Sequence, residues 1–293
     1  MATEVVRPKL WVELCAGSFA VGLRLIGGKH ARPPVAYTGS KLGYGSSVLS
    51  AFGLHSGQGA DAVMICEPGP WAHAWAALSN DEARAGVVAR LRTWVDEDPF
   101  ELWTRLLAEP PNQGDLVWSV SRWLWLLARS YCSTPVAWDA TKASYAPDES
   151  ANGVKVWGAT TIPQLIERVA ALPSSWPNTA IFNGEADTMP EPEQCPPGTF
   201  VYIDPPYAGT SKLYDNEFAR EDVIATAKRW AKAGAFVGIS EGEPLEIEGW
   251  HHYEITHVRR SQKRQFSKQQ REWLTLSRPP AVVVPEPTSW LDL

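Results

Sequence analysis

Short apolar runs alternate with turn and helix signals along much of the chain. Six runs have the length and composition of buried β-strands, at residues 10–14, 62–66, 179–182, 200–203, 235–239 and 273–276. Between the fourth and fifth runs, residues 219–233 carry apolar side chains at the spacing of one helix face, at Val223, Ile224, Ala227, Trp230 and Ala231. The alternation of strand, helix and strand predicts an α/β fold with a parallel sheet covered by helices.

This alternation stops between residues 99 and 177. The stretch holds seven of the 15 tryptophans, and a helical apolar spacing begins at Ile162 with Pro163 suited to a first helical turn. We therefore predict a mostly helical lobe inserted into a larger domain. The predicted parts are a domain of residues 1–98 and 178–278, the lobe at 99–177, and an extended Pro-rich tail at 279–293.

The composition narrows the class of protein. With 293 residues, 44% of them hydrophobic and 20% charged, the chain is not of the disordered, collagen-like or coiled-coil type. Its four cysteines show neither a disulfide framework nor the spacing of a zinc site. The N-terminus lacks a signal-peptide pattern, and no apolar run is long enough to span a bilayer. We expect a cytoplasmic protein with no metal and no membrane partner.

The net charge of −6 conceals one basic segment. Residues 251–278 contain seven basic and two acidic side chains, so the rest of the chain is more acidic than the average suggests. The basic cluster includes Arg259, Arg260, Lys263, Arg264 and Lys268. Such a cluster is typical of a solvated surface loop or of a loop that contacts phosphates, and charge alone leaves both interpretations open.

The sharpest chemical signal follows the fourth apolar run. The strand ends in Asp204, and Pro205 and Pro206 then remove two backbone N–H donors but keep both carbonyl groups, beside the aromatic ring of Tyr207. Ligands of open α/β sheets bind at the carboxyl ends of strands. Asp-Pro pairs also occur in ordinary turns. Here, a rigid set of acceptors beside an aromatic ring suits a flat substrate that donates hydrogen bonds from an amine, such as a nucleobase.

This Asp-Pro-Pro-Tyr motif resembles that of the DNA amino-methyltransferases that use S-adenosylmethionine (SAM), most closely the Dam-like adenine-N6 group. The resemblance covers about two-thirds of the chain. It implies a Rossmann-like SAM-methyltransferase sheet with helices on both faces, with the lobe as target-recognition region. It also implies DNA as partner, and says nothing of a restriction endonuclease. Direct methyl transfer to a flipped-out base would follow, with Asp204, Pro205, Pro206 and Tyr207 as catalytic residues.

The same resemblance assigns the cofactor site. The segment from Trp11 to Phe19 resembles the family's SAM-binding strand and glycine turn. Glu67 stands where an acidic residue accepts hydrogen bonds from ribose hydroxyls, and Asp187 where the adenine amino group of the cofactor is bound. The implied cofactor-binding residues are Glu13, Ala16, Gly17, Ser18, Tyr37, Lys41, Glu67 and Asp187.

The chain departs from the family pattern at two points. Phe19 stands where the turn usually has a second glycine, and the segment 37–41 follows the first strand, whereas Dam-like enzymes carry it ahead of that strand. In the lobe, Arg122 and Arg129 are seven residues apart and share a helix face, which predicts contacts to DNA or to neighbouring parts of the lobe. Trp123, Trp125 and Leu126 are predicted to be core.

Several functions are compatible with these residues. Adenine N6 in DNA is the first, and the motif also permits cytosine N4 or adenine in RNA. A protein-glutamine methyltransferase fits less well, because such enzymes place Asn before the prolines. A module that keeps the fold, binds DNA and has lost SAM is the alternative from another class, supported by Phe19 in the glycine turn.

Overall fold

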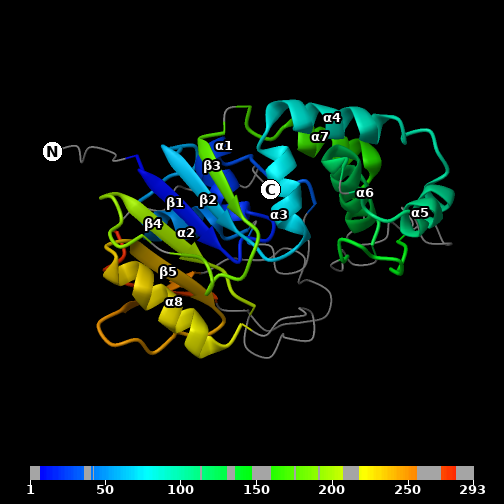
Figure 1. Ribbon diagram of the computed structural model, residues 1–293. Coiled ribbons are helices and arrows are strands. Elements are labelled where there is room, and N and C mark those ends of the chain that lie inside the picture. Colours follow the sequence, from blue (N-terminus) through cyan, green and yellow to red (C-terminus); the bar gives the residue numbers. More distant parts are fainter. Residues whose placement is uncertain are drawn as a thin grey trace, which may run out of the picture.

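A seven-stranded mixed sheet organises the protein, which we describe from a computed structural model (Figure 1). The strand order is β3-β2-β1-β4-β5-β7-β6, with β1 to β5 paired in parallel and β7 antiparallel to both β5 and β6. The strands are β1 (Leu10–Leu14), β2 (Ala62–Cys66), β3 (Asn178–Phe182), β4 (Thr199–Ile203), β5 (Phe236–Glu241), β6 (His251–Ile255) and β7 (Glu272–Leu276). This α/β architecture is compatible with a Rossmann-like fold.

The structure describes residues 7–35, 41, 43–112, 114–130, 136–146, 160–174, 176–190, 192–206, 218–255 and 272–281. All six strands predicted from the sequence are present, to within two residues at either end. The sheet is not wholly parallel as expected, because β7 reverses direction. The sequence did not predict strand β6, since it lies at the edge of the sheet and its exposed and half-buried positions alternate, without the apolar run that marks the other strands.

Helices cover both faces of the sheet, and each face has its own apolar core. One core includes Val12, Leu14 and Val201 with Val223 and Trp230 of α8 (Arg220–Lys232). The other face packs Trp11 and Tyr202 against the residues of α1 (Ala20–Gly27), α2 (Gly45–Ala51) and α3 (Pro70–Leu78). The helix predicted at 219–233 is therefore confirmed as α8, with its apolar side on the sheet.

In the described part of the chain between β2 and β3, five helices follow one another. After α3 come α4 (Asp81–Arg92), α5 (Pro99–Ala108), α6 (Leu116–Ala128) and α7 (Ile162–Ala170). Figure 1 shows α4 to α7 gathered beside the sheet, with α3 between them and the strands. The predicted helical stretch at 99–177 thus contains α5, α6 and α7. The apolar core beneath α1 and α2 continues without a break into these helices.

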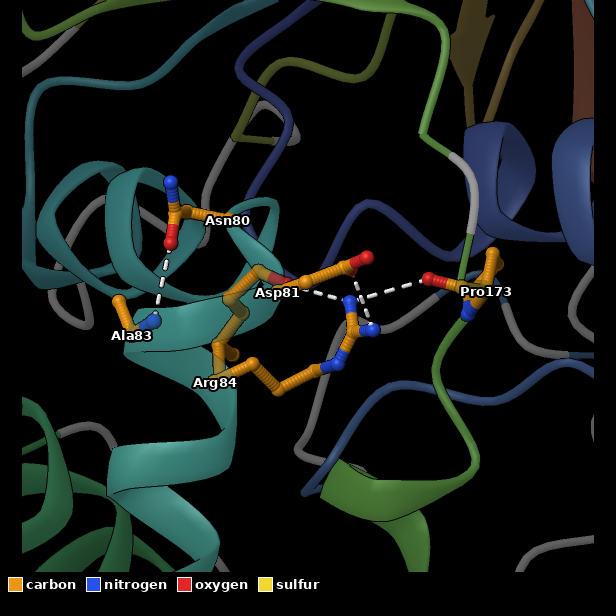
Figure 2. Close-up of polar contacts among 6 residues, drawn as sticks. Asn80, Asp81, Ala83, Arg84 and Pro173 are labelled. Carbon is orange, nitrogen blue, oxygen red and sulfur yellow. Dashed lines mark hydrogen bonds and ion pairs between the residues drawn. The ribbon is translucent and has the colours of Figure 1, made fainter.

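A buried arginine, Arg84, connects the beginning of this helical group to the rest of the chain (Figure 2). Its guanidinium donates to the carbonyl oxygens of Leu78, at the end of α3, and Pro173, beyond α7, at 3.1 and 3.0 Å. It also pairs with Asp81 in the first turn of α4, where the Asn80 side chain caps the helix. The contacts of Arg84 thus fix α3, α4 and the segment that leads into β3 relative to one another.

Candidate functional site

The carboxyl ends of β1 and β4 lie side by side at the centre of the sheet. The N–H of Asp204 donates to the carbonyl of Leu14 at 3.1 Å, which continues the parallel pairing one residue beyond β4. The order of the strands reverses at this point, because the chain continues from β1 to β2 on one side and from β3 back to β4 on the other. Such switch points open a crevice in which doubly wound α/β proteins bind ligands.

The loop that follows β1 adopts an unusual backbone conformation. Cys15, Gly17 and Phe19 have φ angles of 54°, 46° and 52°, in the left-handed region that non-glycine residues rarely occupy. The N–H of Gly17 donates to Glu67 Oε2 at 2.9 Å, and the carbonyl of Gly17 accepts from Trp75 Nε1 at 2.8 Å. Backbone strain of this kind concentrates at functional sites. The loop predicted to hold the cofactor therefore contacts the acidic residue predicted to bind its ribose.

The ring of Phe19 points away from this loop into the core. It is fully buried, stacks with Trp176 at 6.0 Å between ring centroids, and meets Trp75 edge-on at 5.8 Å. A side chain at Gly22 would overlap the same ring, so Gly22 gives Phe19 its space in the first turn of α1. The left-handed backbone explains why glycine suits this position, and the ring of Phe19 contacts the core.

Glu13 lies beneath the loop and supports it. Its Oε2 accepts from Trp11 Nε1 at 3.1 Å and from the N–H of Gly22 at 2.8 Å, and the residue is almost wholly buried. Burial raises the pKa of Glu13 to about 8, against the lowering effect of these two donors. The side chain is therefore mostly a neutral acid at pH 7, and it joins β1 to the start of α1. Ala16 and Ser18 are buried as well.

Lys41, predicted to help close the cofactor pocket, contacts the motif after β4. Its Nζ lies 2.8 Å from Asp204 Oδ1 and 3.5 Å from Glu272 Oε1, and only 7% of its side chain is exposed. Burial disfavours the ammonium, but the two carboxylates outweigh that effect and raise the pKa of Lys41. Three segments far apart in the sequence thus meet in one buried ionic group at the carboxyl edge of the sheet.

This edge is rich in hydrogen-bond acceptors. Burial raises the pKa of Asp204 to about 6, opposed by Lys41, and raises the pKa values of Glu67 and Glu241 to about 7. Neighbouring carboxylates add to each of these increases. The carboxylates crowd together where water is partly excluded. A ligand that donates hydrogen bonds or carries positive charge would stabilise their ionised forms.

The segment after β3 carries two acids near the site, Glu185 and the Asp187 that was predicted to bind the cofactor. The carboxylate of Glu185 contributes to raising the pKa values of Glu67 and Cys15. Asp187 is exposed, contributes to raising the pKa of Cys66, and its backbone carbonyl accepts from Arg229 at 2.9 Å. Of these two acids, Glu185 has the closer electrostatic relation to the loop after β1.

The structure contradicts the prediction that Arg122 and Arg129 form a face for DNA. Arg122 is fully buried, and its guanidinium donates to the carbonyls of Leu106, Trp138 and Ala140 at 2.8–2.9 Å. Arg129 is 2% exposed, donates to the hydroxyl of Tyr145 at 3.1 Å and lies over that ring. Both side chains face inward, because three carbonyls accept from Arg122 and the rings of Trp125 and Tyr145 lie against Arg129. Trp123, Trp125 and Leu126 are buried, as predicted.

Seven predicted site residues fall outside the described residues. They are Tyr37, Tyr207, Arg259, Arg260, Lys263, Arg264 and Lys268. Their assignments remain predictions, as does most of the tail at 279–293. From the basic segment, Arg278 is described, and it donates to the carbonyl of Gly234 at 2.7 Å.

Sequence reasoning missed Glu241 and Glu272 as members of the site. Glu241 ends an apolar strand at the carboxyl edge, the same signal that singled out Glu67 and Asp204, and could have been found by that rule. Glu272 begins its strand and reaches the edge because β7 runs antiparallel to β5. The direction of β7 is a property of the assembled sheet, so the sequence of Glu272 and its neighbours carried no comparable signal.

Three further findings concern metal binding, membrane-spanning helices and similarity to known proteins. Within the described ranges, no cluster of three or more His, Cys, Asp or Glu side chains is arranged to hold a metal ion. Among the helices of the same ranges, none combines the length and apolar character needed to cross a membrane. Compared with known families and with curated proteins, the chain matches no family model and no curated protein.

Proposed function

We propose that this protein transfers the methyl group of SAM to an exocyclic amine of a nucleobase, with adenine N6 in DNA as the preferred acceptor. One observation carries the proposal. The Asp204-Pro205-Pro206 segment lies beside the left-handed loop after β1, across the point where the strand order reverses. A site for an amine and a site for the cofactor that methylates it would then be adjacent.

The residues of this edge fit SAM by their chemistry. Bound SAM would present ribose hydroxyls and amines that donate hydrogen bonds, and a sulfonium that carries positive charge. Glu67 already accepts from Gly17, and a carboxylate has room for further donors. The acidic surroundings of Glu67, Glu185 and Asp204 favour a cation over an anion. We assign ribose binding to Glu67 and close backbone approach to Gly17.

SAM supplies an electrophilic methyl group when bound, and the protein must make a poor nucleophile react with it. The lone pair of an exocyclic amine is delocalised into its ring. Asp204 and the carbonyl of Pro205 would accept hydrogen bonds from the two N–H groups, which favours a pyramidal nitrogen and stabilises the positive charge that develops there. Asp204, with a pKa of about 6, is mostly ionised at pH 7 and is therefore ready to accept.

The nature of the acceptor rests on the resemblance of the motif to Dam-like enzymes. Within this proposal the sheet is a SAM-methyltransferase sheet, and the helices α4 to α7 occupy the place of the target-recognition region. The buried Arg122 and Arg129 have no part in DNA contact. The basic residues at 259–268 remain the proposed phosphate contacts.

The decisive experiment measures transfer of labelled methyl from SAM to unmethylated DNA and RNA, with the modified nucleosides identified by mass spectrometry. Asp204→Asn keeps the size of the side chain and removes its charge, so we expect transfer to fall by at least about a hundredfold. Asp222→Asn makes the same chemical change on the exposed first turn of α8 and serves as the matched control.

The product decides the acceptor. Label in N6-methyladenine of DNA supports the proposal, and label in N4-methylcytosine or in RNA moves the acceptor but keeps the site. SAM binding is measured separately, by the increase of the unfolding temperature with cofactor concentration. Absence of both transfer and SAM-induced stabilisation would refute the proposal and favour a binding module.

A further inference from the structure

Lys41 is paired with two carboxylates at the carboxyl edge of the sheet. Its ammonium lies between the carboxylates of Asp204 and Glu272, at 2.8 and 3.5 Å, and all three side chains are largely buried. Asp204 is the most accessible of the three, with 18% of its side chain exposed against 7% for Lys41 and 6% for Glu272. The open side of the group is therefore the side on which a substrate would meet Asp204.

A buried ion group of this kind contributes little to folding. Removing three charged side chains from water is expensive, and apolar residues of the same volume are often as stable. The arrangement instead controls the charge of Asp204. Among the described residues, the other ionisable groups that act on Asp204 or respond to it are all acids: Glu13 and Cys15 at β1, Glu67 after β2, Tyr202 on β4, Glu241 on β5 and Glu272 on β7.

Lys41 is the cation in direct contact with Asp204, and it opposes this crowding of acids. Glu272 competes for the same ammonium from the other side, at the longer distance. We propose that Lys41 and Glu272 are positioning residues that hold Asp204 ionised and oriented to accept a hydrogen bond from the substrate amine. This inference rests on the proposed function, since it assigns Asp204 its role there.

The two residues are expected to act in opposite directions. Lys41→Met removes the stabilising cation, so the pKa of Asp204 should rise, by about 1–3 units for an opposite charge at this distance. Glu272→Gln removes a carboxylate that repels the charge of Asp204 and competes with it for Lys41, so the pKa of Asp204 should fall. Opposite shifts of one carboxylate are not expected from a general loosening of the structure.

The test has a direct and a functional readout. The full-length protein is labelled with ¹³C in the aspartate carboxyl carbons, and the Asp204 signal is identified by its loss in Asp204→Asn. Its titration is then followed from pH 4 to 9 in the unmodified protein, Lys41→Met and Glu272→Gln. Glu246→Gln, an exposed carboxylate on the connection between β5 and β6, is the matched control. The second readout is the pH dependence of kcat/KM for methyl transfer.

We expect the titration and the acid limb of the rate profile to move to higher pH in Lys41→Met and to lower pH in Glu272→Gln. A two-unit increase would lower the rate at pH 7 about tenfold in Lys41→Met. Movement of both variants in the same direction, or no movement in either, overturns the inference. If Lys41→Met does not fold, the near-isosteric Glu272→Gln decides the question by itself.

The two proposals fail in distinguishable ways. Opposite shifts of the Asp204 titration without methyl transfer to DNA or RNA would sustain the control of Asp204 and refute the reaction. Transfer that depends on Asp204, with a pH profile unchanged in both variants, would sustain the reaction and refute the role of Lys41 and Glu272.

Discussion

Two buried cations, Arg122 in the helical group and Lys41 at the edge of the sheet, differ in the groups that surround them. In the helical group, Arg122 is surrounded by neutral acceptors, the carbonyls of Leu106, Trp138 and Ala140. At the edge of the sheet, Lys41 lies between two carboxylates. Carbonyl groups do not titrate, so the hydrogen-bond acceptors of Arg122 do not change across the physiological pH range. The surroundings of Lys41 change with pH, and a ligand can change them too.

This difference indicates that the helical group has a structural role and that the edge of the sheet forms the candidate site. Arg122 joins the last turn of α5, where the carbonyl of Leu106 has no partner within its helix, to the segment at 138–140. Its planar group of five donors suits fixed acceptors. Lys41 has a single compact charge and contacts Asp204, whose pKa of about 6 lies near neutral pH. We expect perturbations of the helical group to affect stability, and perturbations of the edge to affect pH dependence.

Arg122→Met is expected to give the largest loss of stability. The substitution leaves three carbonyls without their donor inside the helical group, which should cost about 3–5 kcal/mol of the free energy of unfolding. Because the hydrogen-bond acceptors of Arg122 are carbonyls, which do not titrate, the loss should be the same at pH 6 and pH 8. Urea unfolding at both pH values measures it. A loss that changes strongly with pH would mean that Arg122 belongs with the charged edge after all.

Phe19→Gly is expected to give the second largest loss of stability. Phe19 follows β1 in the loop at the site, and its ring packs in the core. The variant loses a fully buried ring but relieves a left-handed backbone, so a net loss of about 2–3 kcal/mol should remain. SAM-induced stabilisation should be retained, since the ring faces the core. Unfolding experiments with and without SAM measure both quantities. Tighter SAM binding in the variant would show that the ring obstructs the loop.

The difference in the free energy of unfolding between the original protein and Glu13→Gln is expected to depend on pH. Because the pKa of Glu13 is raised by folding, its contribution to stability decreases as the pH rises. Folding raises the pKa of Glu13 from 4.5 to about 8, so the folded protein binds a proton that the unfolded chain releases. The contribution of Glu13 is therefore present below about pH 4.5 and is lost as the pH rises to about 8. From pH 6 to 7.5, the original protein should lose about 2 kcal/mol relative to Glu13→Gln.

Urea unfolding of both proteins at these two pH values measures the difference. A constant difference would show that Glu13 is ionised in the folded state. Glu13 would then no longer be a buried neutral acid. The same measurement on Arg122→Met provides the reference for a substitution that is insensitive to pH.

Thr161→Ala is expected to have the smallest effect. Thr161 caps α7 in a reciprocal arrangement with Gln164, and its loss should reduce stability by about 1 kcal/mol. Thermal unfolding measures this change. Methyl transfer should be unaffected, because the cap lies in the helical group. A loss of transfer would show that α7 contributes to the site, against the structural role expected of that group.

Much of the fold could be predicted from the sequence, because central strands are buried on both faces and therefore appear as apolar runs. The motif at Asp204 could be predicted for a related reason, since a polar residue followed by two prolines ends such a run abruptly. The edge strand β6 could not, because its half-exposed pattern resembles that of a surface segment. The burial of Arg122 and Arg129 could not be predicted either. Helical spacing places the two residues on one face, but it does not show what that face contacts.

The sequence by itself determined the α/β class, the central strands and the individual acidic residues that end them, since these depend on local composition and periodicity. Only the tertiary structure decided which of these acids meet. The sheet order sets β4 beside β1, and the antiparallel direction of β7 brings Glu272 to the same edge, where Lys41 joins it from a segment 163 residues away from Asp204. Contacts across such separations arise from the packing of strands and helices, and no local pattern encodes them.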